Sequence, residues 1–262
     1  MTGICIMGEM RKDRTKTPVK WNKKFIYPKS QRSLIQGSRH YDINDKLLPS
    51  VTTIIGATQS EEKKASLAKW KARLGDQAAD RVRDIAALRG TAMHTYLEAY
   101  VRGTGHKDLT SVGQEAEPMA QKIISEGLSG LDEIWGSEGV LYYPDLYAGA
   151  TDIVGIYNGR ESIIDFKQTN KPKKREWIDD YFIQLGAYAM AHNYVYQTQI
   201  QSGIILMCSK DKFFQKFEVS GKEFVRYQHA FLKKVDEYYR NCTHDKNEES
   251  DKNKEISKEI SH

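Results

Sequence analysis

Three consecutive runs of β-branched and aromatic residues in the middle of the chain constrain its fold most. They cover 138–143, 147–157 and 160–168, and their composition is typical of strands. Asn158-Gly159 joins the last two runs, and this dipeptide favours a two-residue type I′ turn because both residues tolerate positive φ. We therefore expect a three-stranded meander whose last two strands form a tight hairpin.

Apolar residues recur at helical spacing on both sides of these strands. The pattern predicts helices over 61–74, 76–101 and 114–128, a helix containing Trp177 to Tyr188, strands near 201–208 and 213–219, and a last helix that ends near 241. This order is typical of an α/β or α+β domain in which helices flank a central mixed β-sheet. Neither an internal repeat nor a Pro-rich or Gly/Ser-rich linker interrupts it, so we expect a single domain over 33–242.

The net charge of +5 is distributed unevenly along the chain. Residues 1–32 carry nine basic and two acidic side chains, whereas residues 243–262 carry four lysines and six acidic side chains. We expect a flexible basic N-terminal arm, which either contacts a polyanion or is an ordinary solvated end. The composition of the last segment predicts a polar disordered tail.

Composition also excludes several classes of protein. The apolar stretches are far shorter than the roughly 18 residues that a membrane helix needs, and the first residues lack the apolar run of a secretory signal. Cys5, Cys208 and Cys242 lie far apart, which argues against a disulfide framework, a zinc knuckle or a four-cysteine iron–sulfur cluster. We expect a protein of a reducing cytoplasm with no membrane partner.

The predicted hairpin places two carboxylates opposite each other. With Asn158-Gly159 as its turn, Gly155 faces Ser162 and Asp152 faces Asp165. Opposed Cβ atoms lie about 4.5–5.5 Å apart, and the neighbouring residues are apolar. Either a shared proton or a divalent cation would offset the repulsion, while the ordinary alternative is a stray Asp pair on a surface hairpin.

Other polar residues accompany this pair. Lys167 follows Asp165 by two residues, so its ammonium projects from the same face, where it either acts on a phosphate or is merely solvated. His94 and Glu98 share a helix face with Gly90, whose missing side chain lets another segment approach closely. Gln184 and Tyr188 likewise share one face of the later helix.

Together these residues resemble the RecB-like branch of the PD-(D/E)XK nuclease superfamily. Four family motifs occur in family order: G-x-x-x-H as Gly90 to His94, G-x-x-D as Gly149 to Asp152, D-x-K as Asp165 to Lys167, and Q-x-x-x-Y as Gln184 to Tyr188. Within this branch the chain is similar to the group of mitochondrial genome maintenance exonucleases and small phage nucleases. That narrower similarity includes Pro49 to Ile54 and the stretch that runs from Leu67 through Asp76 to Gly90.

The resemblance implies a restriction-endonuclease-like core and a metal-dependent DNA exonuclease that uses one or two Mg²⁺ or Mn²⁺ ions and no iron–sulfur cluster. It assigns as metal ligands His94, Asp152, Asp165 and the carbonyl of Phe166. Lys167 matches the catalytic lysine, and Glu138 matches an earlier acidic position of the family. Gln184 and Tyr188 would orient Lys167 or bind a phosphate, and Glu98 would hold His94 by a hydrogen bond.

The resemblance also implies single-stranded DNA ends as the substrate, in replication, repair or recombination. Candidate phosphate contacts are Lys171, Lys173, Lys174 and Arg175, with a solvated loop as the alternative, and Ser50 and Thr52, with an ordinary helix cap as the alternative. Two other functions remain open: a catalytically silent nucleic-acid-binding module, and a flap or structure-specific endonuclease. We expect a monomer, working with replication or recombination proteins, in the host cytoplasm if the chain comes from a phage.

Overall fold

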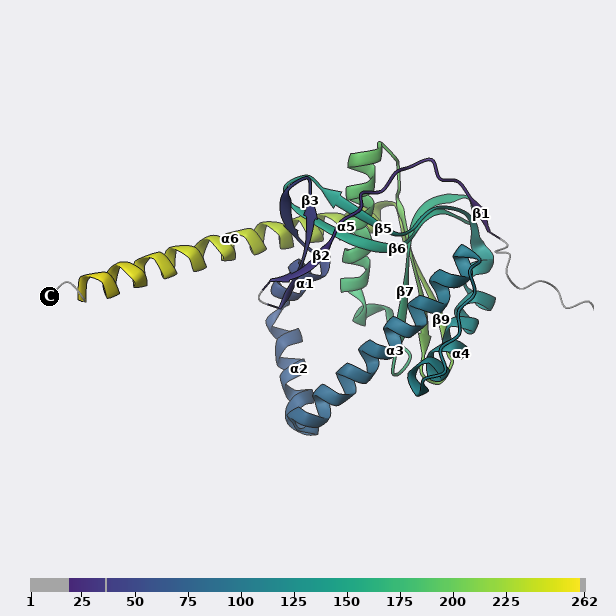
Figure 1. The fold of residues 1–262 in the computed structure, drawn as a ribbon, viewed down its shortest axis with the longest axis horizontal. Coiled ribbons are helices and arrows are strands. Elements are labelled where there is room, and N and C mark those ends of the chain that lie inside the picture. Colours follow the sequence, from purple (N-terminus) through teal and green to yellow (C-terminus); the bar gives the residue numbers. More distant parts are fainter. Residues whose placement is uncertain (1–18, 36, 260–262) are drawn as a thin grey trace, which may run out of the picture.

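The computed structural model describes residues 19–35 and 37–259, with side chains described up to residue 243 (Figure 1). Its central sheet has the strand order β1-β5-β6-β7-β8-β9. These strands are β1 (Lys20–Trp21), β5 (Leu131–Tyr143), β6 (Tyr147–Tyr157), β7 (Arg160–Thr169), β8 (Ser202–Ser209) and β9 (Phe214–Ser220). β1 runs parallel to β5 and β8 parallel to β7, while the other neighbours are antiparallel. The predicted mixed sheet is therefore confirmed.

The hairpin between β6 and β7 has the predicted register. Asn158 and Gly159 have φ values of 47° and 74°, as a type I′ turn requires. Gly155 pairs with Ser162, and the backbone ladder ends at the pair Ile153–Ile164. The two strands therefore stop pairing directly before the predicted carboxylates.

Helices cover both faces of the sheet (Figure 1). One face packs against α3 (Asp76–Arg102) and α4 (Ser111–Glu126), and the other against α1 (Val51–Ala57), α5 (Asp179–Tyr196) and α6 (Gly221–Glu259). Alternate residues of β6 and β7 divide between these two cores, with Ile153 and Ile164 on the α3 side and Val154 and Ile163 on the α5 side. Both strands are thus buried on both faces.

Several element boundaries differ from the predictions. β5 begins at Leu131, seven residues before the predicted start, because charged Glu133 and small Gly136 interrupt its apolar pattern. Trp177 lies in a 3₁₀ turn before α5 and is 59% exposed, so its predicted place in the helix is wrong. In α2 (Glu61–Leu74) and the first half of α3, the periodic apolar residues are exposed rather than buried, among them Leu67, Leu74, Val82, Ile85 and Leu88.

A second, antiparallel sheet was not predicted from the sequence. It consists of β2 (Arg32–Ile35), β3 (Ser38–Ile43) and β4 (Lys46–Pro49). Its strands are short and carry many charged residues, which hides the alternating pattern. Tyr41, Ile43 and Leu48 bury this sheet against Ala148 of β6.

The expected flexible arm is wrong for residues 19–32, and residues 1–18 lie outside the described part of the chain. Val19 is buried, and Trp21 pairs with Ile134 in the sheet. Phe25 and Tyr27 pack against the main core. The basic charge of this segment hid its aromatic residues, which anchor it to the body of the protein.

The C-terminal helix α6 continues through Glu259, into the segment whose composition predicts a disordered tail. Lysine and glutamate are good helix formers, so a polar composition does not by itself oppose a helical backbone. Across the residues the structure describes, no helix is both long enough and apolar enough to span a membrane.

Candidate metal centre and active site

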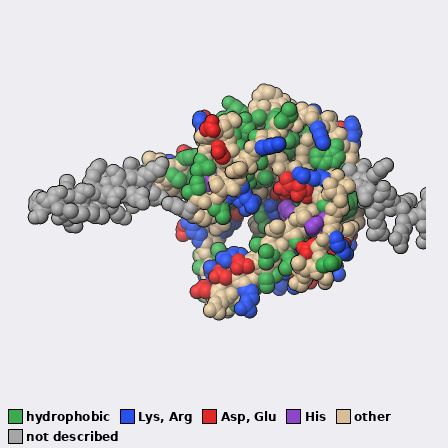
Figure 2. Space-filling model, viewed as in Figure 1, with side chains coloured by type: hydrophobic (Ala, Val, Ile, Leu, Met, Phe, Trp, Pro, Cys, Tyr) green, Lys and Arg blue, Asp and Glu red, His purple; other side chains and the backbone are tan. Residues whose placement is uncertain are grey.

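A cavity of about 590 Å³ opens where β6 and β7 separate. Its wall includes residues from α3, β5, β6, β7, α5 and the small sheet. Among them are most of the predicted site residues: Gly90, His94, Glu98, Glu138, Asp152, Asp165, Lys167, Gln184 and Tyr188. On the face shown in Figure 2, acidic side chains gather beside histidines at the edge of a hollow.

Asp152 is the buried centre of this site. One carboxylate oxygen, Oδ2, accepts a hydrogen bond from the backbone N–H of Phe166 at 2.5 Å. The other, Oδ1, lies 3.0 Å from Nδ1 of His94. The imidazole of His94 thus extends from α3 to the sheet, which brings the G-x-x-x-H and G-x-x-D motifs together.

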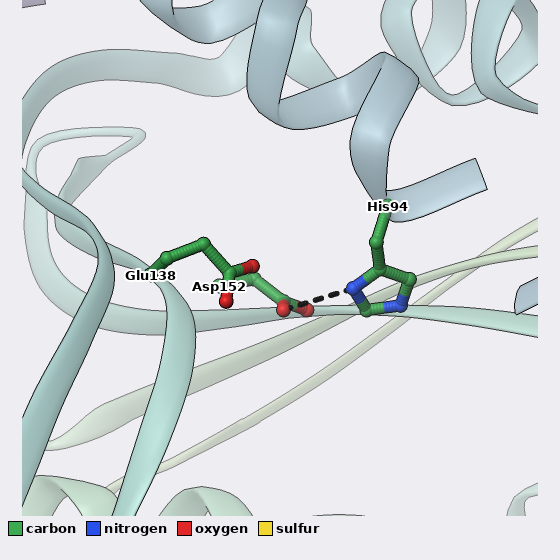
Figure 3. Close-up of side chains that lie close together, drawn as sticks. All are labelled: His94, Glu138 and Asp152. Carbon is green, nitrogen blue, oxygen red and sulfur yellow. Dashed lines mark hydrogen bonds and ion pairs between the residues drawn. The ribbon is translucent and has the colours of Figure 1, made fainter. Parts of the chain in front are cut away.

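Glu138 completes a group of three possible metal ligands. The pairs Ser137–Ile153 and Gly139–Thr151 flank it, so Glu138 lies opposite Asp152 across β5 and β6. Ligand atoms of His94, Glu138 and Asp152 all lie within 4.8 Å of one another. Figure 3 shows both carboxylates and the imidazole pointing to the same space.

The backbone at Glu138 is unusual for a strand. Its φ of 53° lies in the left-handed region, which non-glycine residues adopt rarely. Gly136 and Gly139 stand on either side, and the ring of Tyr27 lies so close that a Cβ atom on Gly136 would come within 2.4 Å of it. The aromatic ring therefore packs directly against the backbone that presents Glu138.

Asp165 and Lys167 form a second charged pair in the cavity. The Lys167 Nζ atom lies 2.5 Å from Asp165 Oδ2 and 5.0 Å from the ring centroid of Tyr181. Both side chains project from the same face of β7, as predicted, and both are largely buried. Asp165 lies outside the group of three, so its role as a ligand stays a prediction, as does that of the Phe166 carbonyl.

Burial and pairing together set the charge of these groups. Burial would lower the pKa of His94, but the neighbouring Asp152 raises that pKa to about 9. Burial would raise the pKa of Asp152, yet His94 holds it below its usual range. Burial does raise the pKa of Asp165, although Lys167 opposes this effect. Glu138 is exposed as a residue, but desolvation of its carboxylate and the charge of Asp152 raise its pKa to about 7.

Lys167 remains a cation in this setting. Burial would lower its pKa, but the carboxylates of Asp165 and Asp152 more than compensate and raise it. Each aspartate thus has its own positive partner, His94 for Asp152 and Lys167 for Asp165. These two ion pairs offset the repulsion that the hairpin register implies.

The wall formed by α5 is hydrogen-bonded within itself. Gln184 donates from Nε2 to the hydroxyl of Tyr188 at 3.0 Å, and both side chains are buried. The ring of Tyr188 fits over Gly149, where a Cβ atom would come within 2.8 Å of it. The Q-x-x-x-Y and G-x-x-D motifs therefore pack against each other. Orientation of Lys167 by Gln184 and Tyr188 stays a prediction.

Two predicted contacts differ in the structure. Glu98 pairs with Arg102 at 2.8 Å, while Nδ1 of His94 is engaged by Asp152, so the expected Glu98–His94 hydrogen bond is wrong. Ser50 caps α1 through its hydroxyl, which accepts from the N–H of Thr53 at 2.9 Å. Ser50 is thus an ordinary helix cap, whereas Thr52 is exposed and lines the cavity.

The four basic residues after β7 do not line this cavity. Lys171 and Lys174 are exposed, and Lys173 is half-buried. Arg175 is committed to the protein, since its guanidinium pairs with Glu223 at 2.9 Å and donates to the carbonyl of Glu218 at 3.0 Å. DNA contact by these four residues stays a prediction. The exposed lysines are better candidates for such a contact than Arg175, whose guanidinium already has partners within the protein.

Sequence reasoning missed the residues that the small sheet adds to the cavity. Arg32, Arg39 and Tyr41 line it, and Arg32 is opposite Tyr41 in the register of β2 and β3. Neither arginine forms an ion pair with an acidic side chain in the described part of the chain. No motif marks them, because their place in the cavity depends on the unpredicted strands.

The donor set fits a divalent cation. Two carboxylates within 4.8 Å of one imidazole supply hard oxygen ligands of the kind that divalent cations prefer, and the imidazole adds a nitrogen ligand. The pKa of Glu138, near 7, and that of His94, near 9, show that without a cation both groups hold protons readily. A bound cation would displace those protons.

No family model matches the chain. Its sequence is 31% identical over 175 residues to mitochondrial genome maintenance exonuclease 1 of Mus musculus, covering 63% of this chain and 50% of the mouse protein. The Homo sapiens protein of the same name is 28% identical over 178 residues, covering 63% of this chain and 50% of the human protein. The chain therefore spans about half the length of the curated relatives that it matches.

Solved structures with some similarity to the chain include two that are described as exonucleases. One, described as an exonuclease from Eubacterium rectale, is 16% identical with a TM-score of 0.45, over 62% of this chain and 68% of that chain. An alkaline exonuclease from Laribacter hongkongensis is 12% identical with a TM-score of 0.24, over 63% and 98% of the two chains. These two structural similarities are too weak to support a conclusion about this chain. Over its matched residues the chain is thus similar in sequence to mitochondrial genome maintenance exonuclease 1, and its motifs and the mixed sheet that carries them resemble those of PD-(D/E)XK nucleases.

Proposed function

We propose that the chain is a metal-dependent DNA exonuclease that hydrolyses phosphodiester bonds at single-stranded ends. One observation carries the proposal: His94, Glu138 and Asp152 converge within 4.8 Å, in the cavity that also holds the Asp165–Lys167 pair. The exonuclease names of the relatives support the reaction, and their genome maintenance supports a role in replication, repair or recombination.

Each group of the cavity has a role in this proposal. Bound by His94, Glu138 and Asp152, a Mg²⁺ or Mn²⁺ ion would polarise the scissile phosphate and lower the pKa of a bound water. Lys167, fixed by Asp165, places a permanent positive charge beside the phosphate and stabilises the charge that develops on it. Arg32 and Arg39 supply further positive charge in the same cavity. We further propose that Lys171 and Lys174 contact the backbone of the strand beyond it.

A catalytically silent DNA-binding module is the main alternative. Such a module has no need for a buried, ion-paired lysine beside three metal-ligand candidates, because burial of unneeded charge costs stability. A flap or structure-specific endonuclease would use the same centre and differ only in the ends it requires. A cytoplasmic location and a monomeric state are part of the proposal.

The test is digestion of 5′- and 3′-labelled single-stranded DNA with Mg²⁺ or Mn²⁺. Wild type should degrade linear strands, and Lys167→Ala and Asp165→Ala should each lose most of this activity. The matched controls Lys222→Ala and Asp211→Ala change exposed residues that line no described cavity, and both should keep it. Equal cleavage by Lys167→Ala and wild type would refute the assignment.

A circular single strand separates the remaining alternatives. An exonuclease leaves the circle intact, whereas an endonuclease opens it. Calorimetry with Mn²⁺ addresses the silent module, since the proposed centre should release heat on binding the ion and Glu138→Gln should weaken that binding. Metal binding without cleavage of any labelled DNA would favour the module.

A further inference from the structure

A second hollow, of about 670 Å³, adjoins the metal centre. Glu138 lines both this hollow and the metal cavity, so the two spaces meet at a possible metal ligand. Trp21, Phe25, Tyr27 and Trp135 form its aromatic wall, and Lys23 and Arg102 its basic rim. None of the motifs described above accounts for this space. Its volume lies within the roughly 300–1,000 Å³ that is usual for small-ligand sites.

The aromatic rings of the hollow differ in how far other groups of the protein cover them. Trp135 is 2% exposed, and the ammonium of Lys24 covers its ring at 3.7 Å from the centroid. Tyr27 lies against the backbone of Gly136 and Gly139. Trp21 differs, because it is only half-buried and its orientation is fixed by a hydrogen bond from its indole N–H to the carbonyl of Val101 at 2.8 Å. Trp21 is therefore a rigid aromatic surface with room beside it.

Positive charge stands next to this surface. Lys23 is exposed, its Nζ lies 5.9 Å from the centroid of the Trp21 ring, and it pairs with no acidic side chain of the described segments. Arg102 adds a second cation, which divides its bonds between Glu98 and the carbonyl of Ser137. A fixed aromatic face beside an ammonium that has no carboxylate partner is a combination that binds an unpaired base together with its phosphate.

We propose that this hollow binds one nucleotide of the substrate strand, next to the scissile phosphate. The base stacks on Trp21, and Lys23 contacts the adjoining phosphate. The inference rests on the proposed nuclease function, because it places the nucleotide relative to a phosphodiester at the metal centre. It adds a reason for the single-strand preference: a paired base cannot enter a hollow of this size without leaving its helix.

Abasic nucleotides test the proposal directly. Equilibrium binding of a short single strand is measured without divalent metal, using oligonucleotides that each lack one base at a successive position from the end. One position should weaken binding to wild type by about 5- to 100-fold, the range that loss of one stacked base implies. The same abasic substitution should have almost no effect on Trp21→Leu, which keeps an apolar side chain without an aromatic face.

Two further variants guard against a general loss of structure. Trp21→Phe keeps stacking and should retain the abasic pattern, while Phe213→Leu changes an exposed aromatic residue that lines neither cavity and should behave as wild type. Lys23→Ala alters only the surface and should reduce the slope of log affinity against log salt by about 0.7, the value for one phosphate contact to a single strand. An abasic pattern that is unchanged in Trp21→Leu would overturn the proposal, and an unchanged salt slope in Lys23→Ala would overturn its phosphate contact.

The catalytic centre is tested separately. Hydrolysis of bis(p-nitrophenyl) phosphate with Mn²⁺ by wild type, and its loss in Lys167→Ala, concerns the proposed nuclease alone. If that hydrolysis occurs while the abasic scan shows no dependence on Trp21, the hollow is not a nucleotide site although the nuclease assignment holds. If no phosphodiester is hydrolysed, the proposed function fails on its own evidence.

Discussion

Glu138 lies opposite Asp152 across β5 and β6, and it does so with a left-handed backbone, at a φ of 53°. That conformation costs energy for any residue with a side chain, so the surroundings must hold it. Tyr27 packs against the glycines on either side. The N-terminal segment, which carries no motif residue, therefore supports a residue of the candidate metal centre.

Gly136→Ala should weaken metal binding without touching a ligand. The new Cβ atom would lie 2.4 Å from Cε2 of Tyr27, so the ring or the strand must move. We expect Mn²⁺ affinity to fall by about 10-fold or more, on the scale seen when a partner of a metal ligand is lost. Calorimetric titration measures this change. Gly56→Ala is the control, since nothing lies within 4 Å of its added atom.

A second substitution separates ring displacement from general damage. If the clash with Tyr27 is the cause, the double variant Gly136→Ala/Tyr27→Ala should bind Mn²⁺ more tightly than Gly136→Ala/Tyr27→Phe, because only the former makes room. Equal affinities in both double variants would assign the loss to the strand itself.

His192 should make the folded state sensitive to mild acid. Burial, and secondarily the charge of Lys24, lower its pKa from 6.5 to about 4. Because the folded pKa is below the unfolded one, the stabilising contribution is complete above pH 6.5 and is lost as the pH falls towards 4. At pH 4.5 the loss amounts to about 2–3 kcal/mol.

Urea unfolding at pH 7 and pH 4.5 measures this effect. Compared with wild type, His192→Gln should lose less stability between the two pH values, since glutamine does not titrate. The absolute stability of the variant is not the readout, because His192 also bonds to Tyr27 and Thr198. The same loss in both proteins would show that other groups account for the acid sensitivity.

Replacing Lys171 and Lys174 should change DNA binding, whereas replacing Arg175 should mainly change stability. Both lysines are exposed, so Lys171→Ala/Lys174→Ala should reduce the salt slope of binding to single-stranded DNA by about 1.4 and leave unfolding unchanged. Arg175 pairs with Glu223 and contacts the ring of Phe182, so Arg175→Ala should mainly lower the midpoint of thermal unfolding. Fluorescence anisotropy at several salt concentrations and thermal melts distinguish the two outcomes. An unchanged salt slope in the double lysine variant would contradict the proposed contact.

Local chemistry made the centre of the fold predictable. The Asn158-Gly159 turn sets the register of β6 and β7 down to the pair Ile153–Ile164, directly before Asp152 and Asp165, and the alternation of side chains along β7 places Lys167 on the face of Asp165. The strands β6 and β7 are also rich in apolar residues, as strands that are buried on both faces of a sheet must be. These features depend on residues close in sequence, so the sequence expresses them directly.

Contacts between distant segments were less predictable. Glu98 is four residues from both His94 and Arg102, so helical spacing alone cannot choose its partner, and the permanently charged guanidinium is the stronger one. Arg32 and Arg39 reach the cavity through short, charged strands that lack an alternating pattern. The aromatic residues between Trp21 and Tyr27 were obscured by the lysines among them.

The backbone N–H of Phe166 gives its hydrogen bond to the carboxylate of Asp152, just past the point where the ladder between β6 and β7 ends. The carboxylate of Asp152, in the candidate metal centre, thus accepts the hydrogen bond that the carbonyl of a neighbouring strand would otherwise accept. Removing that carboxylate opens the sheet as well as the site, so an inactive Asp152 variant would have two inseparable defects. The side chain of Lys167 accepts no backbone hydrogen bond of this kind. A substitution at Lys167 therefore tests the catalytic role of the site with less disturbance of the sheet.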